Sequence, residues 1–367
     1  MEDLVVDRPV DPITPIRSMA DRKRILVTGG DGYIGNILVP HLMRAGFDVS
    51  VADAGFYRGA WLYNDGQDRA PLRTADVRSV SVDDLRGFDV VVHLAELSND
   101  PLCEHDESLT IGINHLGTVA LAEACRSAGV RRFVYASSCS IYGAAEEDMV
   151  CETSPMRPQT AYARCKALVE RDVGALADMD FSPVFLRFAT AFGASPRMRF
   201  DIVLNNLAGL AWTTGRISLS SDGTPWRPLV HVLDISEAVS QVVGAPREAV
   251  HNEIFNVGAN KNNHRVSDLA QLAAVVFPGC SLEFGGKHGD NRSYRVSFEK
   301  IGRHLPNFRC EWTAEQGFRQ LRALFEHIGL RSEDFVAAPY TRVRQLGHLL
   351  RTKQVDETLR WRSHAIL

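Results

Sequence analysis

A short apolar strand followed by three regularly spaced glycines does most to limit how this chain can fold. Residues 24–28 favour a β-strand, and Gly29, Gly32 and Gly35 follow at intervals of three. Apolar residues then recur at helical spacing over 34–42. This order of strand, glycine turn and helix is what a phosphate-binding βα unit requires. The glycines would allow a tight turn, close approach of a pyrophosphate, and close packing of helix on strand; the helix N-terminus would offer its free N–H groups to the anion.

The next expected strand ends in an acidic residue that bears on the choice of cofactor. Residues 49–52 form a short apolar run, and Asp53 follows it, 18 residues after Gly35. A carboxylate at this place can accept hydrogen bonds from an adenosine ribose, and it would repel a 2′-phosphate. The sequence therefore predicts a dinucleotide, with NAD favoured over NADP. Arg58 and Arg73 leave room for NADP.

Strands and helices continue to alternate through the first half of the chain. Residues 89–94, 132–137 and 183–188 are continuous apolar runs, as buried parallel strands tend to be. A single helix is expected over 109–128, between the first two of these strands. The alternation predicts an α/β fold: a doubly wound, Rossmann-like parallel sheet covered by helices on both faces.

From residue 191 onward the alternation becomes irregular, and a smaller C-terminal substrate-binding domain is expected. The predicted division is an N-terminal extension over 1–23, a dinucleotide-binding domain over 24–190 and mainly a substrate-binding cap over 191–367. A strand and a helix over about 229–245 are expected to return to the first domain. The chain from residue 314 is expected to be mostly helical. Its last part has three open roles: covering the substrate cleft, packing on a partner subunit, or completing the surface.

Composition narrows the class of protein. The net charge is −4 at pH 7 and no basic block is present, which argues against nucleic-acid binding. No apolar run approaches the roughly 20 residues that cross a bilayer, and residues 1–23 lack an apolar signal core. The seven cysteines show neither a C-x-x-C pair nor zinc-like spacing, so reduced thiols and no metal site are expected. We therefore expect a cytoplasmic protein without a nucleic-acid or membrane partner.

Tyr162 and Lys166 are the residues best suited to chemistry. Four residues apart on an expected helix, they share one face. An ammonium beside a phenol stabilises the phenolate, so the pKa of Tyr162 is expected to fall below that of free tyrosine. Tyr162 would then relay a proton in the oxidation of an alcohol or the reduction of a ketone. Ser138 follows the strand over 132–137, at the sheet edge where ligands bind. The spacing alone also fits a surface lysine, so its meaning depends on the dinucleotide unit before it.

In order and spacing, the motifs resemble the extended short-chain dehydrogenase/reductase superfamily, within its nucleotide-sugar epimerase/dehydratase group. The resemblance runs from about residue 24 into the C-terminal region and is carried by residues 28–35, 76–78, 93–95, 114–118, 137–143, 162–166 and 227–235. It implies that Tyr162 takes a hydroxyl proton while hydride moves to NAD, that Lys166 also holds the nicotinamide ribose, and that Ser138 hydrogen-bonds the reacting oxygen. Ser138 is assigned as the residue four positions before Tyr142, with Ser137 as the alternative. The implied cofactor-binding residues are Gly29, Gly32, Tyr33, Ile34, Gly35, Asp53, Asp76, Val77, Leu94, Ala95, Asn114, Tyr162 and Lys166.

Departures from the group's pattern bear on the reaction. Cys139 and Ser140 stand where dehydratases of the group have an Asp-Glu pair, which disfavours a 4,6-dehydratase. In epimerase-reductases similar to GDP-fucose synthase the reactive cysteine would align with Ser140, so Cys139 is expected to serve packing. Glu96 replaces a residue that is usually small and apolar. It would contact the sugar or act as an extra acid/base, or else point to solvent or pair with an arginine.

The resemblance implies a nucleotide-sugar substrate. Arg227 and Arg292 are the candidates for binding its diphosphate, because a guanidinium fork suits two phosphate oxygens. The implied substrate-binding residues are Glu96, Ser140, Asn205, Asn206, Arg227 and Arg292. We expect an NAD-dependent nucleotide-sugar epimerase working through a transient keto-sugar, with Tyr162 as acid/base. The alternatives are an NAD(P)H-dependent ketoreductase of an NDP-4-keto sugar or related metabolite, and a non-catalytic dinucleotide sensor. A homodimer is expected from the resemblance, through the helices over 109–128 and 161–177.

Overall fold

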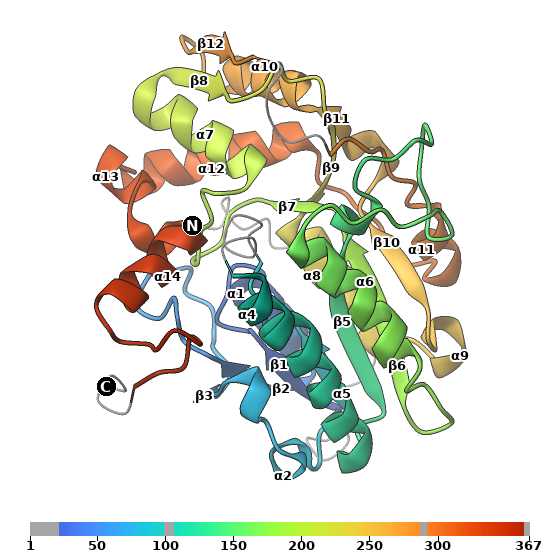
Figure 1. The fold of residues 1–367 in the computed structure, drawn as a ribbon. Helices are drawn as coiled ribbons and strands as arrows, with labels where there is room; N and C mark the ends of the chain where they lie inside the picture. The colour runs from blue at the N-terminus through green and yellow to red at the C-terminus, as the bar shows by residue number, and fades with distance from the viewer. Residues whose placement is uncertain (1–21, 99–105, 287–291, 363–367) are drawn as a thin grey trace.

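A seven-stranded sheet, parallel throughout, forms the centre of the computed structural model, which describes residues 22–98, 106–286 and 292–362 (Figure 1). The strand order is β10-β6-β5-β4-β1-β2-β3, so the order reverses between β1 and β4, where doubly wound sheets bind ligands. This confirms the predicted fold class. The strands are β1 (Arg24–Thr28), β2 (Asp48–Asp53), β3 (Leu72–Thr74), β4 (Val90–His93), β5 (Arg132–Ser138), β6 (Ser182–Phe188) and β10 (Ile254–Val257).

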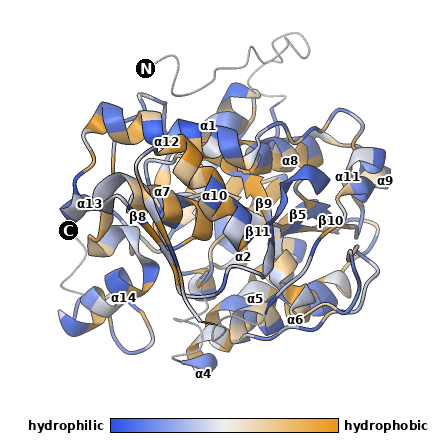
Figure 2. Cartoon of the chain, turned by 90° about the horizontal axis from the view of Figure 1, so that it is seen from above, coloured by the Kyte–Doolittle hydropathy of each residue, from blue (hydrophilic) through white to orange (hydrophobic). Residues whose placement is uncertain are grey.

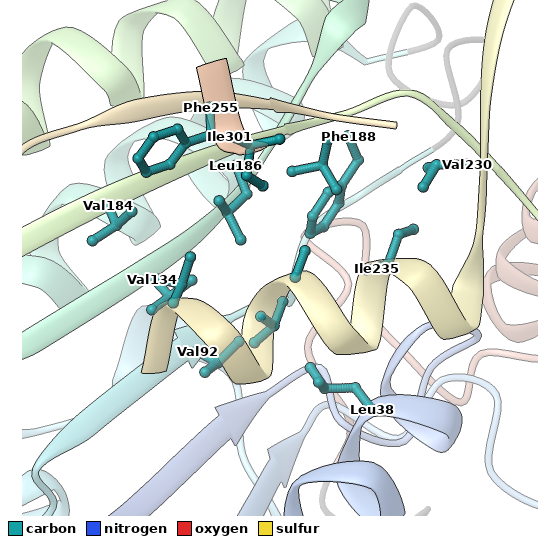
Figure 3. Packing of buried hydrophobic residues seen from close by; sticks show 14 of the residues in the cluster. Leu38, Val92, Val134, Val184, Leu186, Phe188, Val230, Ile235, Phe255 and Ile301 are labelled. Carbon is teal, nitrogen blue, oxygen red and sulfur yellow. The ribbon is translucent and has the colours of Figure 1, made fainter. Parts of the chain in front are cut away.

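Helices cover both faces of this sheet because successive strand residues point to opposite sides. Val92 and Val134 face a core closed by α1 (Gly35–Arg44) and α8 (Val232–Gly244), where Leu38 and Ile235 pack (Figure 3). Their strand neighbours, among them Val91 and Phe133, face the core under α5 (Gly117–Ala128) and α6 (Ala161–Gly174). Two packed layers of helices thus hold the carboxyl ends of the strands in fixed positions.

The helix expected over 109–128 is divided in the structure. It consists of α4 (Glu107–Thr110), a π-helical segment η3 (Ile111–Leu116) and then α5. The side chain of Asn114 lies inside the π-helical segment and bonds to the backbone of Leu97 in both directions, at 2.9 and 2.8 Å. The segment therefore anchors the chain that follows β4.

A second apolar core lies in the cap. It is formed by α7 (Val203–Thr214), α10 (Val266–Val276) and α12 (Ala314–Ile328), whose apolar residues gather where the three helices meet (Figure 2). Small sheets flank them: β7 (Thr190–Phe192), β9 (Trp226–His231) and β11 (Asn263–Arg265) form one, and β8 (Arg216–Leu219) and β12 (Ser281–Phe284) the other. The remaining short helices are α2 (Val82–Leu85), α9 (Arg247–Val250), α11 (Glu299–His304), α13 (Ser332–Phe335) and the 3₁₀ segments η2 (Val77–Ser79), η4 (Cys139–Tyr142), η5 (Asn260–Asn262) and η6 (Ala338–Tyr340).

Parts of the second half of the chain pack on the central sheet. The strand and helix expected near 229–245 are β9 and α8; α8 packs on α1 and β5, whereas β9 pairs outside the central sheet. In addition, β10 joins the sheet beside β6. The last helix of the described residues, α14 (Arg342–Arg351), shares a core cluster with Ala52 of β2 rather than packing in the cap core, and Figure 1 shows it in red at one side of the molecule. No helix in the described part of the chain is long and apolar enough to cross a membrane.

Candidate functional site

The turn after β1 accepts only glycine at two of the predicted positions. Gly29 has a φ of 77°, and a Cβ there would lie 2.6 Å from the backbone nitrogen of Ala95. A Cβ on Gly35 would lie 2.4 Å from the carbonyl oxygen of Gly30. The turn is therefore pressed between the start of α1 and the segment after β4, which includes Leu94 and Ala95. Its backbone N–H groups at the start of α1 form the cradle that a pyrophosphate needs.

Asp53 stands at the end of β2, beside this turn. Its carboxylate accepts hydrogen bonds from the backbone N–H groups of Asp31, at 3.1 Å, and Gly55, at 2.7 Å. Burial raises the pKa of Asp53. Asp31 itself forms an ion pair with Arg197, which lies in the segment after β7. The glycine cradle and this oriented carboxylate fit the pyrophosphate and adenosine ribose of a dinucleotide.

Tyr33 leaves the glycine turn and enters the cap. Its hydroxyl donates to the carbonyl of Gly193 at 2.8 Å and accepts from the amide of Asn205 at 3.1 Å. Asn205 also accepts from the N–H of Gly193, and Asn206 donates to the carbonyl of Phe200. These contacts join the glycine turn to the cap. The substrate role of both asparagines stays a prediction.

The remaining predicted cofactor residues lie around the same strand ends. Asp76 caps the 3₁₀ segment η2 and forms an ion pair with Arg78 at 2.6 Å, while Val77 packs in the core beneath. Ile34 packs against both main cores. Asn114, as described above, holds the backbone of Leu97, so a direct contact of its side chain with a cofactor stays a prediction.

The three predicted catalytic residues come from β5 and α6. Thr160 caps α6, accepting a hydrogen bond from the N–H of Ala163 at 3.2 Å, and this cap places Tyr162 in the first turn of the helix. The ammonium of Lys166 lies 5.2 Å from the centre of the Tyr162 ring, so the two side chains share one face as predicted. Ser138 ends β5, where its hydroxyl accepts from the N–H of Ser140 at 3.1 Å.

Ser137, the alternative to Ser138, points elsewhere. Its hydroxyl donates to a carboxylate oxygen of Glu170 at 2.5 Å, and Glu170 pairs with Arg187 at 2.7 Å inside the protein. Neighbouring residues on a strand face opposite sides. The geometry therefore supports Ser138 as the serine of the candidate site.

Glu96 is buried and paired with the lysine of the site. Its carboxylate forms an ion pair with the ammonium of Lys166, which also donates to the carbonyl of Ala136. The hydroxyl of Tyr135 donates to the other carboxylate oxygen of Glu96 at 2.6 Å. The side chains of Glu96 and Lys166 are 3% and 4% exposed, and burial raises the pKa of Glu96. Of the roles considered for Glu96, exposure to solvent and pairing with an arginine are therefore wrong. The pair with Lys166 was missed because the spacing of residues on a helix does not predict a contact with the loop that follows a strand.

Cys139 and Ser140, the two residues after Ser138, have different surroundings. The thiol of Cys139 donates to the carbonyl of Arg187 at 3.2 Å, and burial raises its pKa, so its surroundings are those of a packed, un-ionised thiol. The hydroxyl of Ser140 is buried and has no hydrogen-bond partner among the residues that the structure describes. An enclosed hydroxyl without a partner suits a ligand contact, as expected for Ser140.

The structure brings the two predicted diphosphate ligands together. The guanidinium of Arg227, on β9, donates to the carbonyls of Trp226, at 2.9 Å, and of Arg292. The arginines therefore lie side by side in the cap, although they are far apart in the chain. Their contact with a diphosphate stays a prediction.

Sequence reasoning missed three arginines near the dinucleotide end of the site. Arg197 binds Asp31, and Arg199 pairs with Asp201 at 2.9 Å while donating to the hydroxyl of Ser98. Arg342 reaches the same region from α14. The first two belong to the basic and aromatic stretch 195–200, which offered a signal, whereas no local pattern marks Arg342.

Three comparisons place this geometry among known proteins. The model of the family described as "NAD dependent epimerase/dehydratase family" matches residues 25–258. A protein named UDP-glucose 4-epimerase 4 from Oryza sativa subsp. japonica is 28% identical over 336 residues, covering 82% of this chain and 88% of the relative. A UDP-glucose 4-epimerase from Streptomyces lividans is 30% identical over 279 residues, covering 69% of this chain and 80% of the relative. The solved structure of MoeE5 in complex with UDP-glucose and NAD is 27% identical, with a TM-score of 0.71, covering 83% of this chain and 99% of that one.

Proposed function

We propose that this chain, which belongs to the NAD-dependent epimerase/dehydratase family, is a nucleotide-sugar epimerase. Its family makes it an NAD-dependent sugar-nucleotide enzyme of the extended short-chain dehydrogenase type. The observation that carries the proposal is the arrangement of Tyr162 and Lys166 on one face of α6, with Lys166 bonded to the carbonyl of Ala136 near the end of β5, where Ser138 stands. This arrangement suits the removal of a proton from a sugar hydroxyl. Relatives named UDP-glucose 4-epimerase support a UDP-hexose as the first substrate to test.

Each residue has a defined task in the proposed reaction. Tyr162, as phenolate, takes the proton of the sugar hydroxyl and returns it when the keto group is reduced, and Ser138 donates a hydrogen bond to the same oxygen. When bound, NAD would supply the acceptor for the sugar's hydride, and return of that hydride to the opposite face of the transient keto-sugar would invert the carbon. The positive charge of Lys166 favours the phenolate of Tyr162. The sugar thus leaves with one inverted carbon and with no net change in oxidation state.

The residues after Ser138 favour epimerisation over loss of water. Elimination needs an acid and a base near the carbons that lose the proton and the hydroxyl. Cys139 faces the protein interior and Ser140 carries a hydroxyl, so neither supplies a carboxylic acid at that place. These two positions hold the Asp-Glu pair in dehydratases of the group.

The test is to incubate the purified protein with NAD and a panel of UDP-, dTDP- and GDP-hexoses and to measure epimers by chromatography. We expect interconversion of two epimers and no steady consumption of added cofactor. A Tyr162→Phe variant should lose activity by at least ~100-fold, because it cannot accept the proton. A Tyr340→Phe variant, which removes a hydroxyl from the surface segment η6, should keep it. No epimer with any sugar would refute the proposal, and continuous oxidation of NADH or NADPH in a parallel assay with an NDP-4-keto sugar would support the ketoreductase instead.

We also propose that the protein is a homodimer through the faces of α5 and α6. Leu116, directly before α5, is 58% exposed, which suits an apolar contact with a second copy. Light scattering should show a dimer for the unchanged protein and a monomer for Leu116→Glu. A monomer in both cases would refute this assembly.

A further inference from the structure

The C-terminal tail packs against the end of the sheet that holds the dinucleotide turn. Gln345, on α14, donates to the carbonyl of Phe56 at 2.9 Å. The indole of Trp361 donates to the carbonyl of Ala54 at 2.6 Å, and its ring lies 6.0 Å from that of Phe56. Ala54 directly follows Asp53. The tail therefore lies beside the residues expected at the adenosine ribose.

Apolar contacts fix the tail in this position. Its side chains share a core cluster with residues of β2 and η2, so the tail is part of the same folded unit as the glycine turn. The buried tail residues are Leu346, Leu349, Val355 and Leu359, and they share the cluster with Ala52 and Val77.

Arg342, the first residue of α14, is a buried cation at the front of this tail. It is 5% exposed, and its guanidinium carbon lies 3.7 Å from the centre of the Tyr57 ring. With the residues over 22–98, 106–286 and 292–362 it makes neither a hydrogen bond nor an ion pair. Burial lowers the pKa of Arg342, whose charge interacts with Asp53 and Asp201. An arginine cannot shed its proton to relieve this burial.

The neighbouring carboxylates already have partners. Asp53 accepts from two backbone N–H groups, and Asp201 forms a two-pronged pair with Arg199. A buried charge without a hydrogen-bonded partner is strongly unfavourable, and the face of the Tyr57 ring offsets only part of that cost. An anion that enters beside Asp53 would supply the missing partner.

We propose that Arg342 binds the diphosphate of the bound NAD and that the C-terminal tail thereby clamps the dinucleotide on the enzyme. Arg342 lies within electrostatic range of Asp53, at the expected ribose. It also lies on Tyr57, whose carbonyl accepts a hydrogen bond from Arg197, the ion-pair partner of Asp31 in the glycine turn. The diphosphate lies between these two places in a dinucleotide bound to this fold. A guanidinium fork matches two phosphate oxygens and has no acceptor for a ribose to donate to. The clamp depends on the use of NAD and is independent of whether the sugar is epimerised.

The test compares Arg342→Gln with Arg351→Gln, which removes the same charge from an exposed position at the end of the same helix. Affinities of cofactor-free protein for NAD, ADP-ribose, ADP and adenosine are measured by calorimetry. For Arg342→Gln we expect a loss of ~10- to 100-fold for the three ligands that carry a diphosphate, the size of one charge-assisted hydrogen-bonded contact. Adenosine should bind equally well to all three proteins, and Arg351→Gln should match the unchanged protein throughout.

Three outcomes would overturn the proposal. Unchanged NAD affinity in Arg342→Gln would show that the guanidinium has no ligand in the cofactor. An equal loss for adenosine would assign Arg342 to the packing of the tail, and an equal loss in Arg351→Gln would assign the effect to the general charge of the helix.

A measurement on the unchanged protein covers the case in which Arg342→Gln folds poorly. Trypsin cleavage after the exposed Lys353 in the tail is followed with and without ligand. NAD and ADP should slow the cleavage several-fold and adenosine should not. Equal cleavage rates under all conditions would refute the clamp.

Discussion

Glu96 changes the surroundings of the lysine on which the proposed chemistry depends. A lysine beside a catalytic tyrosine favours the phenolate, but here the ammonium of Lys166 is shared with the carboxylate of Glu96. Tyr135 holds that carboxylate from the other side. The pair therefore places one negative charge next to the positive charge that Tyr162 needs. We infer that Glu96 is a positioning residue that sets the protonation of Tyr162 through Lys166.

Replacing Glu96 by Gln should move the pH profile of the enzyme. The amide keeps an acceptor for Tyr135 but removes the negative charge, so the phenolate of Tyr162 becomes easier to form. The rising limb of the rate against pH should shift to lower pH by about 0.5 to 1 unit. The matched control is Glu107→Gln, which breaks an exposed pair between Glu107 and Arg164 on the same helix as Tyr162. A profile that stays in place while overall activity falls would assign Glu96 to structure alone.

Gly35→Ala should damage the cofactor site more than an ordinary helix substitution. The new methyl group would lie 2.4 Å from the backbone oxygen of Gly30, so the glycine turn must shift. We expect a destabilisation of about 1–3 kcal/mol and a weaker binding of NAD. Gly244→Ala, at the end of α8, meets no atom within 4 Å and should be neutral or slightly stabilising. Urea unfolding and titration with NAD measure both effects, and equal behaviour of the two variants would contradict the argument.

At the scale of elements, the strands were predictable and one helix was not. The central strands are continuous apolar runs ended by polar or glycine residues, so local patterning alone located β1 and β5 within a residue. The helix expected over 109–128 was wrong in detail, because it contains a π-helical segment. Helical periodicity does not reveal that Asn114 must turn toward the backbone of Leu97. Contacts between distant segments, such as Glu96 with Lys166, were equally invisible.

The π-helical segment should depend on Asn114. An Asn114→Ala variant loses two buried hydrogen bonds to Leu97 and leaves its N–H and C=O groups without these partners. We expect a loss of about 2–4 kcal/mol in the free energy of unfolding. Urea unfolding of the variant beside Asn206→Ala, which loses one hydrogen bond to Phe200, gives the comparison. A smaller loss for Asn114→Ala than for Asn206→Ala would contradict the anchoring role.

At the scale of the whole molecule, contacts between distant segments determine where the C-terminal tail lies, which sequence patterns did not predict. The C-terminal tail shares a core with β2 and η2, beside the expected cofactor site, and this position was not among the three roles considered for it. Composition and spacing could not show this, since Trp361 and Ala54 are separated by 307 residues. The return of α8 and β10 to the central sheet likewise joins the two halves of the chain. Such a molecule should unfold as one unit.

Two buried histidines, one in the dinucleotide fold and one in the cap, should make the stability of the protein depend on pH. His93 lies between the hydroxyls of Thr28 and Thr118 in the dinucleotide fold, at 2.6 and 2.8 Å. His231 lies in the cap, bonded to Gln320 at 2.8 Å and stacked on Trp312 with ring centres 4.1 Å apart. Burial lowers the pKa of each histidine to about 3. Both are therefore neutral in the folded protein across the pH range in which the unfolded chain takes up protons.

Stability should consequently fall on acidification from pH 6.5 toward pH 3. Above the unfolded pKa of about 6.5 the unfolded chain gains no proton at these positions, and the stability is fully present. Below it, each buried histidine lowers the free energy of unfolding by about 1.4 kcal/mol per pH unit. The variant His231→Gln should reduce the slope of the free energy of unfolding against pH by the contribution of one proton. Urea unfolding between pH 7 and pH 5 measures this slope. His327→Gln, an exposed position on α12, gives the comparison with a histidine at the surface. If His231→Gln and the unchanged protein show the same slope, His231 takes up its proton in the folded state and the buried environment described for it is wrong.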